Sequence, residues 1–160
     1  MDLHSKNNFL VGVISDTHGH LHPAVVKAFK NVDLIVHAGD IGKWEILETL
    51  QKIAPVVAVR GNMDGKEWTH SLPWTEVVKI GKVMFYVLHD IYTLDLDPAA
   101  AGFAAVISGH SHRSSTDRRD GVLFINPGSA TEPRYNSPAS VVLLQGRDTV
   151  LETRFIDLDA

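Results

Sequence analysis

Residues 9–18 read FLVGVISDTH, and this stretch decides the fold. Six apolar or glycine positions in a row, three of them β-branched, predict a strand that is buried on both faces. The apolar run then stops, and Asp16 and His18 follow it. In an extended backbone, residues i and i+2 point to the same side and lie roughly 6.6 Å apart, so both side chains can reach one metal ion. Open α/β sheets form their sites beyond the carboxyl ends of strands, which is where this pair lies.

The first half of the chain repeats this device of a strand followed by polar residues. Apolar runs alternate with segments of helical periodicity, and this alternation implies parallel strands joined by right-handed crossovers. The expected elements are strands over 9–14, 33–40 and 55–59, a helix over 23–30, and a second helix with Trp44, Leu47, Leu50 and Ile53 on its buried face.

Beyond residue 65 the pattern becomes strand-rich. Gly81-Lys82 separates two apolar runs, 75–80 and 83–88, which predicts a hairpin. We expect a loop with a short helix over 91–102, a strand over 104–107, and two further hairpins that turn at 120–121 and 146–148. No internal repeat or linker stands out. The whole pattern favours an α/β protein of two packed sheets with helices outside, forming one domain over 1–160.

Composition excludes several classes of protein and site. The chain has 160 residues and a net charge of −4, so broad binding to polyanions is not indicated. There is no cysteine, which excludes disulfides and thiolate metal sites. No apolar stretch approaches the ~18 residues of a membrane span, and residues 1–8 lack the apolar core of a signal peptide, so we expect a cytoplasmic protein. The three tryptophans are too scattered to predict stacking on nucleic acid.

Metal-binding side chains follow five of the expected strands. Because the carboxyl ends of aligned strands converge at one edge of a sheet, we expect these side chains to meet there. Seven nitrogen and oxygen donors exceed the four that a tetrahedral zinc ion takes, and they suit two ions that share a carboxylate. The candidate ligands are Asp16, His18, Asp40, Asn62, His89, His110 and His112.

In this order, D-x-H, G-D, G-N, a histidine after a strand and G-H-x-H, the sequence resembles the calcineurin-like metallophosphoesterases. It is most similar to the small single-domain phosphodiesterases of bacteria and archaea, which also carry the N-P-G-S segment found at 126–129. The resemblance runs from about residue 10 to the C-terminus. It implies an α/β/β/α sandwich of two mixed sheets flanked by helices.

The resemblance also implies a division of the ligands between two metal ions. Asp16, His18 and His112 would bind the first ion. Asn62, His89 and His110 would bind the second, and Asp40 would bridge both. The implied activity is that of a dinuclear-metal phosphoesterase, specifically a phosphodiesterase acting on a small phosphate ester by in-line attack of a hydroxide that bridges the metals. Asp40, Asn62 and His110 are the expected catalytic residues.

The ligand types narrow the choice of metal. Imidazole with carboxylate and amide oxygen suits Mn²⁺, Fe²⁺, Co²⁺, Ni²⁺ or Zn²⁺. The resemblance favours Mn²⁺, with Ni²⁺ next.

Two positions depart from the family pattern. Met63 stands where larger members carry a histidine thought to aid catalysis, and a thioether cannot donate a proton. The expected general acid is therefore missing. Asp90 stands where the pattern has glycine, and its larger side chain would narrow the site.

Several other polar residues receive supporting roles. Asp64 is expected either to orient neighbouring loops or to bond its own turn, and Asn126 and Ser129 to support the ligand loops. We expect His37 to be a buried, hydrogen-bonded histidine, with contact to a metal ligand as the alternative. His20 and His22 are expected at the rim of the site or in solvent.

Two other functions remain open at this point. A eukaryotic retromer subunit shares the implied fold and serves mainly in protein–protein contact, so a scaffold is one alternative. Hydrolysis of a pyrophosphate-linked nucleotide is the other. Relatives of this kind often form dimers or tetramers, which indicates a homo-oligomer.

Overall fold

The structure is a computed structural model that describes residues 3–132, 134 and 136–160. Met1 and Asp2, part of the stretch considered for a signal peptide, lie outside these residues. Five strands form the first sheet, in the order β10-β9-β1-β2-β3. The strands β1, β2 and β3 are parallel, and β9 is antiparallel to both β1 and β10. Their bounds are β1 Asn8–Ile14, β2 Leu34–His37, β3 Val56–Ala58, β9 Ser140–Arg147 and β10 Val150–Asp157.

The second sheet also has five strands, in the order β4-β5-β6-β8-β7. Its three central strands are parallel, and an antiparallel strand lies at each edge. Both sheets are thus mixed, as the family resemblance implies. The bounds are β4 Thr75–Ile80, β5 Val83–Leu88, β6 Ala105–Ile107, β7 Ser115–Arg119 and β8 Val122–Asn126.

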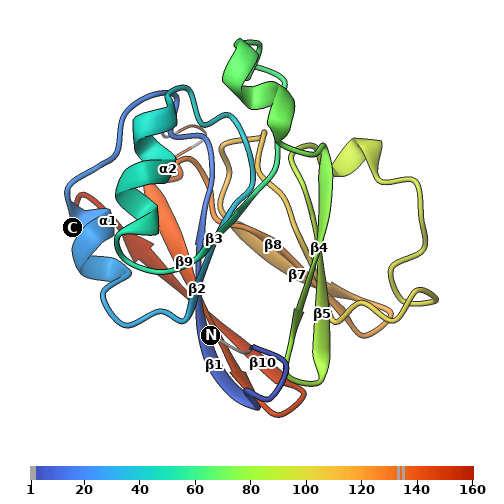
Figure 1. Cartoon of the computed structure of the whole chain (residues 1–160). Coiled ribbons are helices and arrows are strands. Elements are labelled where there is room, and N and C mark those ends of the chain that lie inside the picture. The colour runs from blue at the N-terminus through green and yellow to red at the C-terminus, as the bar shows by residue number, and fades with distance from the viewer. Residues whose placement is uncertain (1–2, 133, 135) are drawn as a thin grey trace.

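The two sheets pack face to face over a continuous apolar core (Figure 1). Val13 and Val36 of the first sheet belong to the same buried cluster as Phe85 and Ile107 of the second. The rings of Phe9 and Phe85 join the sheets directly, with their centroids 6.0 Å apart. Strands covered on both faces must be apolar throughout, and this explains the unbroken runs in the sequence.

Two helices, α1 (Ala24–Ala28) and α2 (Trp44–Gln51), cover the outer face of the first sheet. Gly12 of β1 makes room for Phe29 beside α1, because a Cβ at this position would lie 2.8 Å from the Phe29 ring.

The expected buried face of α2 was partly wrong. Ile46 is buried with Leu47 and Leu50, whereas Trp44 is 41% exposed. Trp44 lies in the first turn and packs edge-on against Trp68, so it stays at the surface. Ile53 lies beyond the end of the helix at Gln51.

The outer layer of the second sheet differs from the first. Residues 91–103 cover this face, and their only helical element is the short 3₁₀ turn η2 (Ile91–Thr93). A second 3₁₀ turn, η1 (Glu67–Ser71), lies in the loop between β3 and β4. The last hairpin turns at Asp148-Thr149, slightly later than expected, because Arg147 still pairs with Val150. Among the described residues, no helix is long and apolar enough to cross a membrane.

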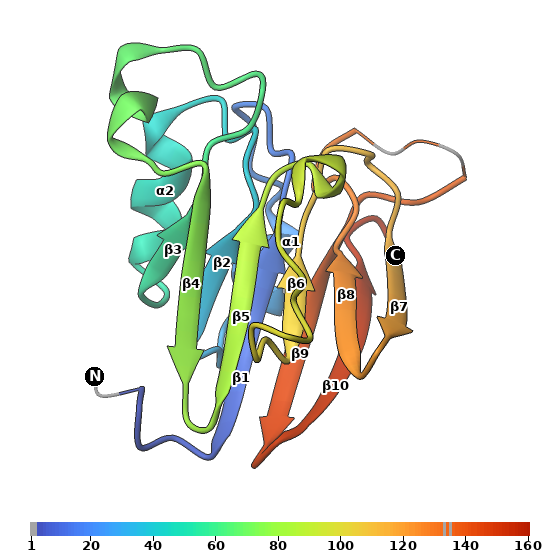
Figure 2. The same cartoon turned by 90° about the vertical axis from the view of Figure 1, so that its right-hand side faces the viewer.

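The strand directions determine where the polar loops meet. Figure 2 shows β5, β6 and β8 pointing to the same end of the molecule. The loops that follow the parallel strands of both sheets gather there.

Candidate metal centre

Each of the seven expected ligands lies just after a parallel strand. Asp16 and His18 follow β1, Asp40 follows β2, Asn62 follows β3, His89 directly follows β5, and His110 and His112 follow β6. The structure therefore gathers side chains from five segments at one end of the sandwich.

Five of these residues form two groups whose donor atoms lie within 4.8 Å of one another. One group is Asp16, His18 and His112, and the other is Asp16, Asp40 and His89. The Oδ1 atom of Asp16 joins the groups, since it lies 3.1 Å from His112 Nε2 and 3.9 Å from His89 Nε2. Sequence reasoning placed Asp16 at one metal only, and no pattern in the sequence marks this second contact.

Asp40 also reaches toward both groups. Its Oδ2 atom lies 3.2 Å from His89 Nε2 and 4.0 Å from His18 Nε2. Its other oxygen, Oδ1, accepts a hydrogen bond of 2.8 Å from the backbone N–H of Met63. That bond orients the carboxylate so that Oδ2 faces the histidines.

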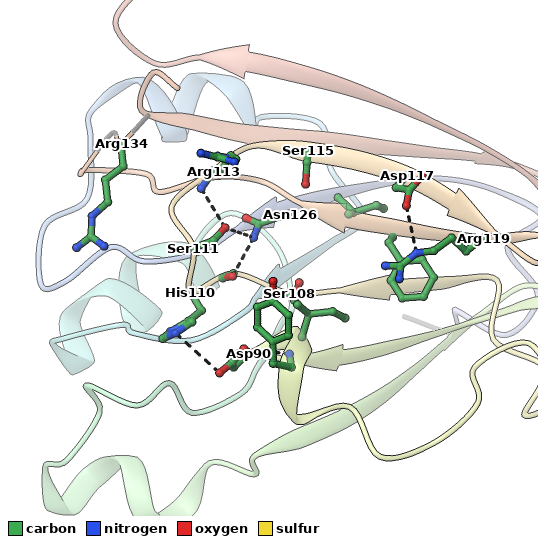
Figure 3. Close-up of a pocket in the computed structure, with 15 residues that line it drawn as sticks. Asp90, Ser108, His110, Ser111, Arg113, Ser115, Asp117, Arg119, Asn126 and Arg134 are labelled. Atoms are coloured by element: carbon green, nitrogen blue, oxygen red, sulfur yellow. Dashed lines mark hydrogen bonds and ion pairs between the residues drawn. The ribbon is translucent and has the colours of Figure 1, made fainter. Parts of the chain in front are cut away.

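Asn62 and His110 lie together, but His110 belongs to neither group. Nδ1 of His110 is 3.1 Å from Asn62 Oδ1. Its Nε2 is 3.8 Å from Asp90 Oδ2, as Figure 3 shows. The imidazole is 42% exposed, whereas Asp16, Asp40, His89 and His112 are buried. Asp90 thus contacts an expected ligand rather than merely filling space.

Two buried histidines are held with Nε2 directed into the centre. Nδ1 of His89 lies 2.7 Å from the carbonyl oxygen of Ala38, and Nδ1 of His112 lies 3.1 Å from that of Glu132. A carbonyl can only accept, so each Nδ1 carries a proton and donates it. In the neutral ring, the Nε2 lone pair then faces the carboxylates.

The centre has the features of a cation site. Among the described residues, buried Asp16 Oδ1 and His89 Nε2 have no hydrogen-bond partner. Buried polar atoms are normally paired, so atoms of this kind need an explanation. A divalent cation would satisfy a carboxylate oxygen and an imidazole nitrogen together, and both are ligands for first-row divalent ions.

Comparison with known proteins matches this geometry to a family. The calcineurin-like phosphoesterase superfamily domain matches residues 9–149. The chain belongs to this superfamily. The family acts on phosphate esters and uses divalent metals, so the protein is a metallophosphoesterase and a hydrolase.

Relatives and solved structures agree with the assignment. A probable metallophosphoesterase of Methanocaldococcus jannaschii is 37% identical, over 94% of this chain and 82% of its own. A phosphodiesterase of the same organism is 31% identical, over 74% and 82% of the two chains. The crystal structure of a Vps29 mutant from Entamoeba histolytica superposes with a TM-score of 0.72 at 26% identity, covering 92% of this chain and 98% of the other. The family and the α/β sandwich expected from the sequence are thereby confirmed.

In this calcineurin-like phosphoesterase the two aspartates stay ionised. Burial raises the pKa of Asp16, but the nearby His18 imidazole and the hydrogen bond that Ser15 donates to Asp16 Oδ2 outweigh it and hold the pKa below its usual value. Burial likewise raises the pKa of Asp40, and the contact with His89 more than offsets this. Both carboxylates are therefore available to a cation near neutral pH.

The same contacts raise the pKa of two histidines. The Asp16 carboxylate raises the pKa of His18. For His89, burial lowers the pKa, but the contact with Asp40 and the charge of Asp16 raise it overall. Protons and metal ions therefore compete for these imidazoles, and metal binding weakens as the pH falls.

The expected extended spacing of Asp16 and His18 was wrong. Strand β1 ends at Ile14, and both residues have a positive φ, 56° and 46°. Asp40, His110 and His112 share this left-handed conformation, with φ of 55°, 71° and 60°. A non-glycine residue pays about 1 kcal/mol or more for this backbone, and such residues concentrate at functional sites. The side chains of Asp16 and His18 meet through a tight turn, with His18 Nε2 3.7 Å from Asp16 Oδ1.

His37 connects two of the loops that carry the candidate ligands. It is fully buried, and its Nδ1 accepts a hydrogen bond from the Gly39 N–H. Its Nε2 therefore carries the proton and donates it to Thr17 Oγ1, 3.0 Å away, which in turn donates to the Ile41 carbonyl. This chain links the loop after β1 to the loop after β2.

Asp64 joins the loops after β2 and β3. Its carboxylate accepts hydrogen bonds from the backbone N–H groups of Ile41, Gly42 and Gly61. Of the two roles considered for Asp64, the structure shows the orienting one, together with a bond inside its own turn.

Ser129 and Asn126 contact the ligand loops as expected. Ser129 Oγ donates to the Asp16 carbonyl at 2.9 Å, and Asn126 Nδ2 donates to the Gly109 carbonyl at 2.8 Å. Thr131, which the sequence analysis missed, makes a second hydrogen bond to the Asp16 carbonyl. Ser15 and Thr17 were also missed, although their alternation with the ligands in S-D-T-H was a usable signal.

The remaining histidines stay at the surface. His22 Nε2 lies 2.9 Å from Asp159 Oδ1, near the end of the chain, and His20 is exposed. Neither belongs to the two groups of candidate ligands.

Proposed function

We propose that this protein is a dinuclear-metal phosphodiesterase. The observation that carries the proposal is the pair of ligand groups joined at Asp16 Oδ1, a buried oxygen without a hydrogen-bond partner. A cation bound beside this oxygen would satisfy it together with the nitrogens around it, and Asp40, whose Oδ2 faces both His89 and His18, would be shared with a second cation. The phosphodiesterase of M. jannaschii supports a diester substrate, since it shares most of its length with this chain.

The ligands would divide between the ions as the family pattern implies. Asp16, His18 and His112 would hold the first ion. Asn62, His89 and His110 would hold the second, with Asp40 between them. When bound, two divalent ions would lower the pKa of a coordinated water and polarise the phosphoryl oxygens.

The chain's own residues prepare the site for an anion. Asp16 and Asp40 contribute −2 against the +4 of two divalent ions, so the centre stays positive although the protein is net negative. The Asn62 amide stands at the exposed side of the centre beside His110, where it can donate to a phosphoryl oxygen. Met63 is 67% exposed and supplies its backbone N–H to Asp40, but its side chain cannot protonate a leaving group.

We propose Mn²⁺ as the activating metal. Four imidazoles with carboxylate and amide oxygen suit Mn²⁺, Fe²⁺, Co²⁺, Ni²⁺ or Zn²⁺.

Chelation and reconstitution test the proposal. The protein is stripped of metal and assayed with bis(p-nitrophenyl) phosphate before and after Mn²⁺ is restored, alongside Asp40→Asn. Asparagine tolerates the positive φ of residue 40, so the backbone is kept while the charge is lost. Asp148→Asn is the matched control, because Asp148 also has a positive φ but lies in an exposed turn.

We expect about two Mn²⁺ per chain, metal-dependent turnover, loss of at least a hundredfold in Asp40→Asn, and no change in Asp148→Asn. One ion per chain would refute the dinuclear centre. Metal-independent turnover would refute the metal mechanism.

The likeness to Vps29 favours a second candidate, a protein-interaction scaffold. A vacuolar protein sorting protein is named for transport and not for hydrolysis, and it has the same fold. Metal binding without turnover of any phosphate ester would favour this role. Comparing an aryl diester, an aryl monophosphate and a nucleotide sugar separates a diesterase from a pyrophosphate-linked nucleotide hydrolase. The single domain over 1–160, the homo-oligomer and the cytoplasmic location stay predictions.

A further inference from the structure

A groove of about 650 Å³ opens beside His110, an exposed candidate ligand. This volume falls within the ~300–1,000 Å³ that is usual for small-ligand sites. Figure 3 shows Arg113 and Arg134 near His110 at one end of the groove, and Asp117 with Arg119 toward the other. Because the groove begins at the metal centre, part of a substrate held by the metals would extend into it.

The groove continues along the outer face of the second sheet. A second hollow of about 640 Å³ shares Ile91, Tyr92, Arg119 and Phe124 with the first. The two hollows therefore form one trough between the 91–100 segment and the hairpin β7–β8. The shared residues mark the place where a substrate arm several bonds long would lie.

The part of the trough that belongs to both hollows is lined by planar side chains. Tyr92 is 94% exposed, the highest value among the large apolar and aromatic side chains at the surface. Across the trough, the Arg119 guanidinium lies 4.0 Å from the centre of the Phe124 ring and also forms an exposed ion pair of 3.1 Å with Asp117. A guanidinium stacked on a ring has a second planar face, and planar groups bind well to such a face.

Tyr92 is also held in place at its backbone. Its N–H donates a hydrogen bond of 3.0 Å to Asp90 Oδ1, and the other oxygen of Asp90 faces His110. Asp90, one of the two residues that depart from the family pattern, thus contacts both Tyr92 and His110. Its carboxylate links the backbone position of Tyr92 to a candidate metal ligand.

We propose that this trough binds a nucleobase, so that the substrate is a small phosphodiester with a nucleoside as one arm. The inference rests on the proposed function, because the metals would hold the phosphate while the base lies between Tyr92 and Arg119. The cationic side chains of Arg113 and Arg134 at the near end suit the phosphate of such an arm. The scattered tryptophans predicted no platform for nucleic acid, and none of the three lines the trough.

Adenosine 5′-monophosphate and ribose 5-phosphate test the assignment, since they differ only by the base. Their Kd values are measured by titration calorimetry on the Mn²⁺-loaded protein, on Tyr92→Ala and on Arg119→Ala. Phe155→Ala is the control, because Phe155 is an exposed aromatic residue of β10, in the other sheet. Stacking of one base is worth about tenfold or more in affinity.

We expect the adenosine compound to bind at least tenfold more tightly than the ribose compound. The ratio should fall below about threefold in Tyr92→Ala and in Arg119→Ala and persist in Phe155→Ala. Equal binding of the two ligands by the unaltered protein would overturn the proposal, and so would a ratio that survives both trough variants.

Hydrolysis of bis(p-nitrophenyl) phosphate by the same samples separates the two claims. If the base preference is present but turnover is absent, the phosphodiesterase proposal fails and the trough remains a nucleotide site. If turnover is present without the base preference, only the trough assignment fails.

Discussion

The Nε2 atoms of His18 and His112 lie 3.3 Å apart, although 94 positions separate the two residues in the chain. Nδ1 of His112 donates to the Glu132 carbonyl, so the Nε2 of its neutral ring offers a lone pair. At this distance the two nitrogens need either a proton that His18 Nε2 donates to His112 Nε2 or a cation that binds both. A metal ion at this position would take the place of that proton.

Metal binding should accordingly raise the thermal stability of the protein. A ligand at 100 times its Kd stabilises the folded state by about 2.7 kcal/mol, which corresponds to a Tm increase of about 5–10 °C for a chain of this size. We expect this increase when Mn²⁺ is added to chelated protein, measured by differential scanning calorimetry. In His112→Gln the increase should fall by at least half, and an unchanged increase there would place the bound ion elsewhere.

His37 should make the protein sensitive to acid. Burial lowers the pKa of His37 to about 3 in the folded protein, whereas the unfolded chain has a value near 6.5. Between these values the unfolded state binds more protons, so stability is complete above pH 6.5 and is lost as the pH falls, by up to about 1.4 kcal/mol per pH unit.

Urea unfolding of metal-free protein at several pH values measures this loss. His37→Gln keeps a donor for Thr17 but does not titrate. Between pH 6.5 and 5, the unfolding free energy of this variant should therefore fall by about 2 kcal/mol less than that of the unaltered protein. Parallel pH profiles for the two proteins would show that His37 is not the source of the acid sensitivity.

Met63 should limit the choice of leaving group. Without a general acid at this position, turnover should fall steeply as the leaving group becomes more basic, and general acid catalysis is typically worth about 10²–10⁴-fold. Met63→His should therefore raise kcat at least tenfold for an alkyl phosphodiester and much less for an aryl one. Met63 is largely exposed, so the substitution leaves the core intact. Equal turnover of alkyl and aryl diesters by the unaltered protein, with chemistry rate-limiting, would contradict the prediction.

Asp64 should affect metal binding without touching the metal. Its carboxylate holds the backbone of two ligand loops through Ile41 and Gly61. Asp64→Asn removes the charge and one acceptor, and we expect a loss of about 1–3 kcal/mol in unfolding free energy and 10–100-fold in Mn²⁺ affinity. Asp97→Asn is the control, since Asp97 also accepts from two backbone N–H groups but in an exposed loop. If both variants lose the same small amount of unfolding free energy and of Mn²⁺ affinity, Asp64 is an ordinary turn residue.

The sequence predicted the elements best where local chemistry decides them. The hairpin around Gly81-Lys82 has the predicted bounds, because a turn signal and two apolar runs leave one way to pair the strands. The position of the seven polar residues at strand ends was equally readable. The buried face of α2 was predicted less accurately, because Trp44 packs against Trp68, a residue outside the helix.

The details of the site were less accessible. Periodicity assumes regular backbone, and it cannot show that Asp16 and His18 leave the strand in a left-handed turn. Nor can it show that His110 stands beside Asp90 and edge-on to the His89 ring, since that depends on how the loops after β5 and β6 pack together. Gly109 permits the loop after β6 to pack against the loop after β1, because a Cβ there would collide with Ser15 and Asp16.

The left-handed backbone at five of the candidate ligands also determines how such a site can decay. Aspartate, asparagine, histidine and glycine tolerate this conformation, whereas a β-branched residue at Asp16 or Asp40 would strain the fold even with no metal bound. In a homologue that no longer needs catalysis, substitutions of these ligands by asparagine or glycine would therefore be tolerated, whereas valine or isoleucine would destabilise the fold. Its loops would keep their shape, and a scaffold would inherit the outline of an enzyme's active site.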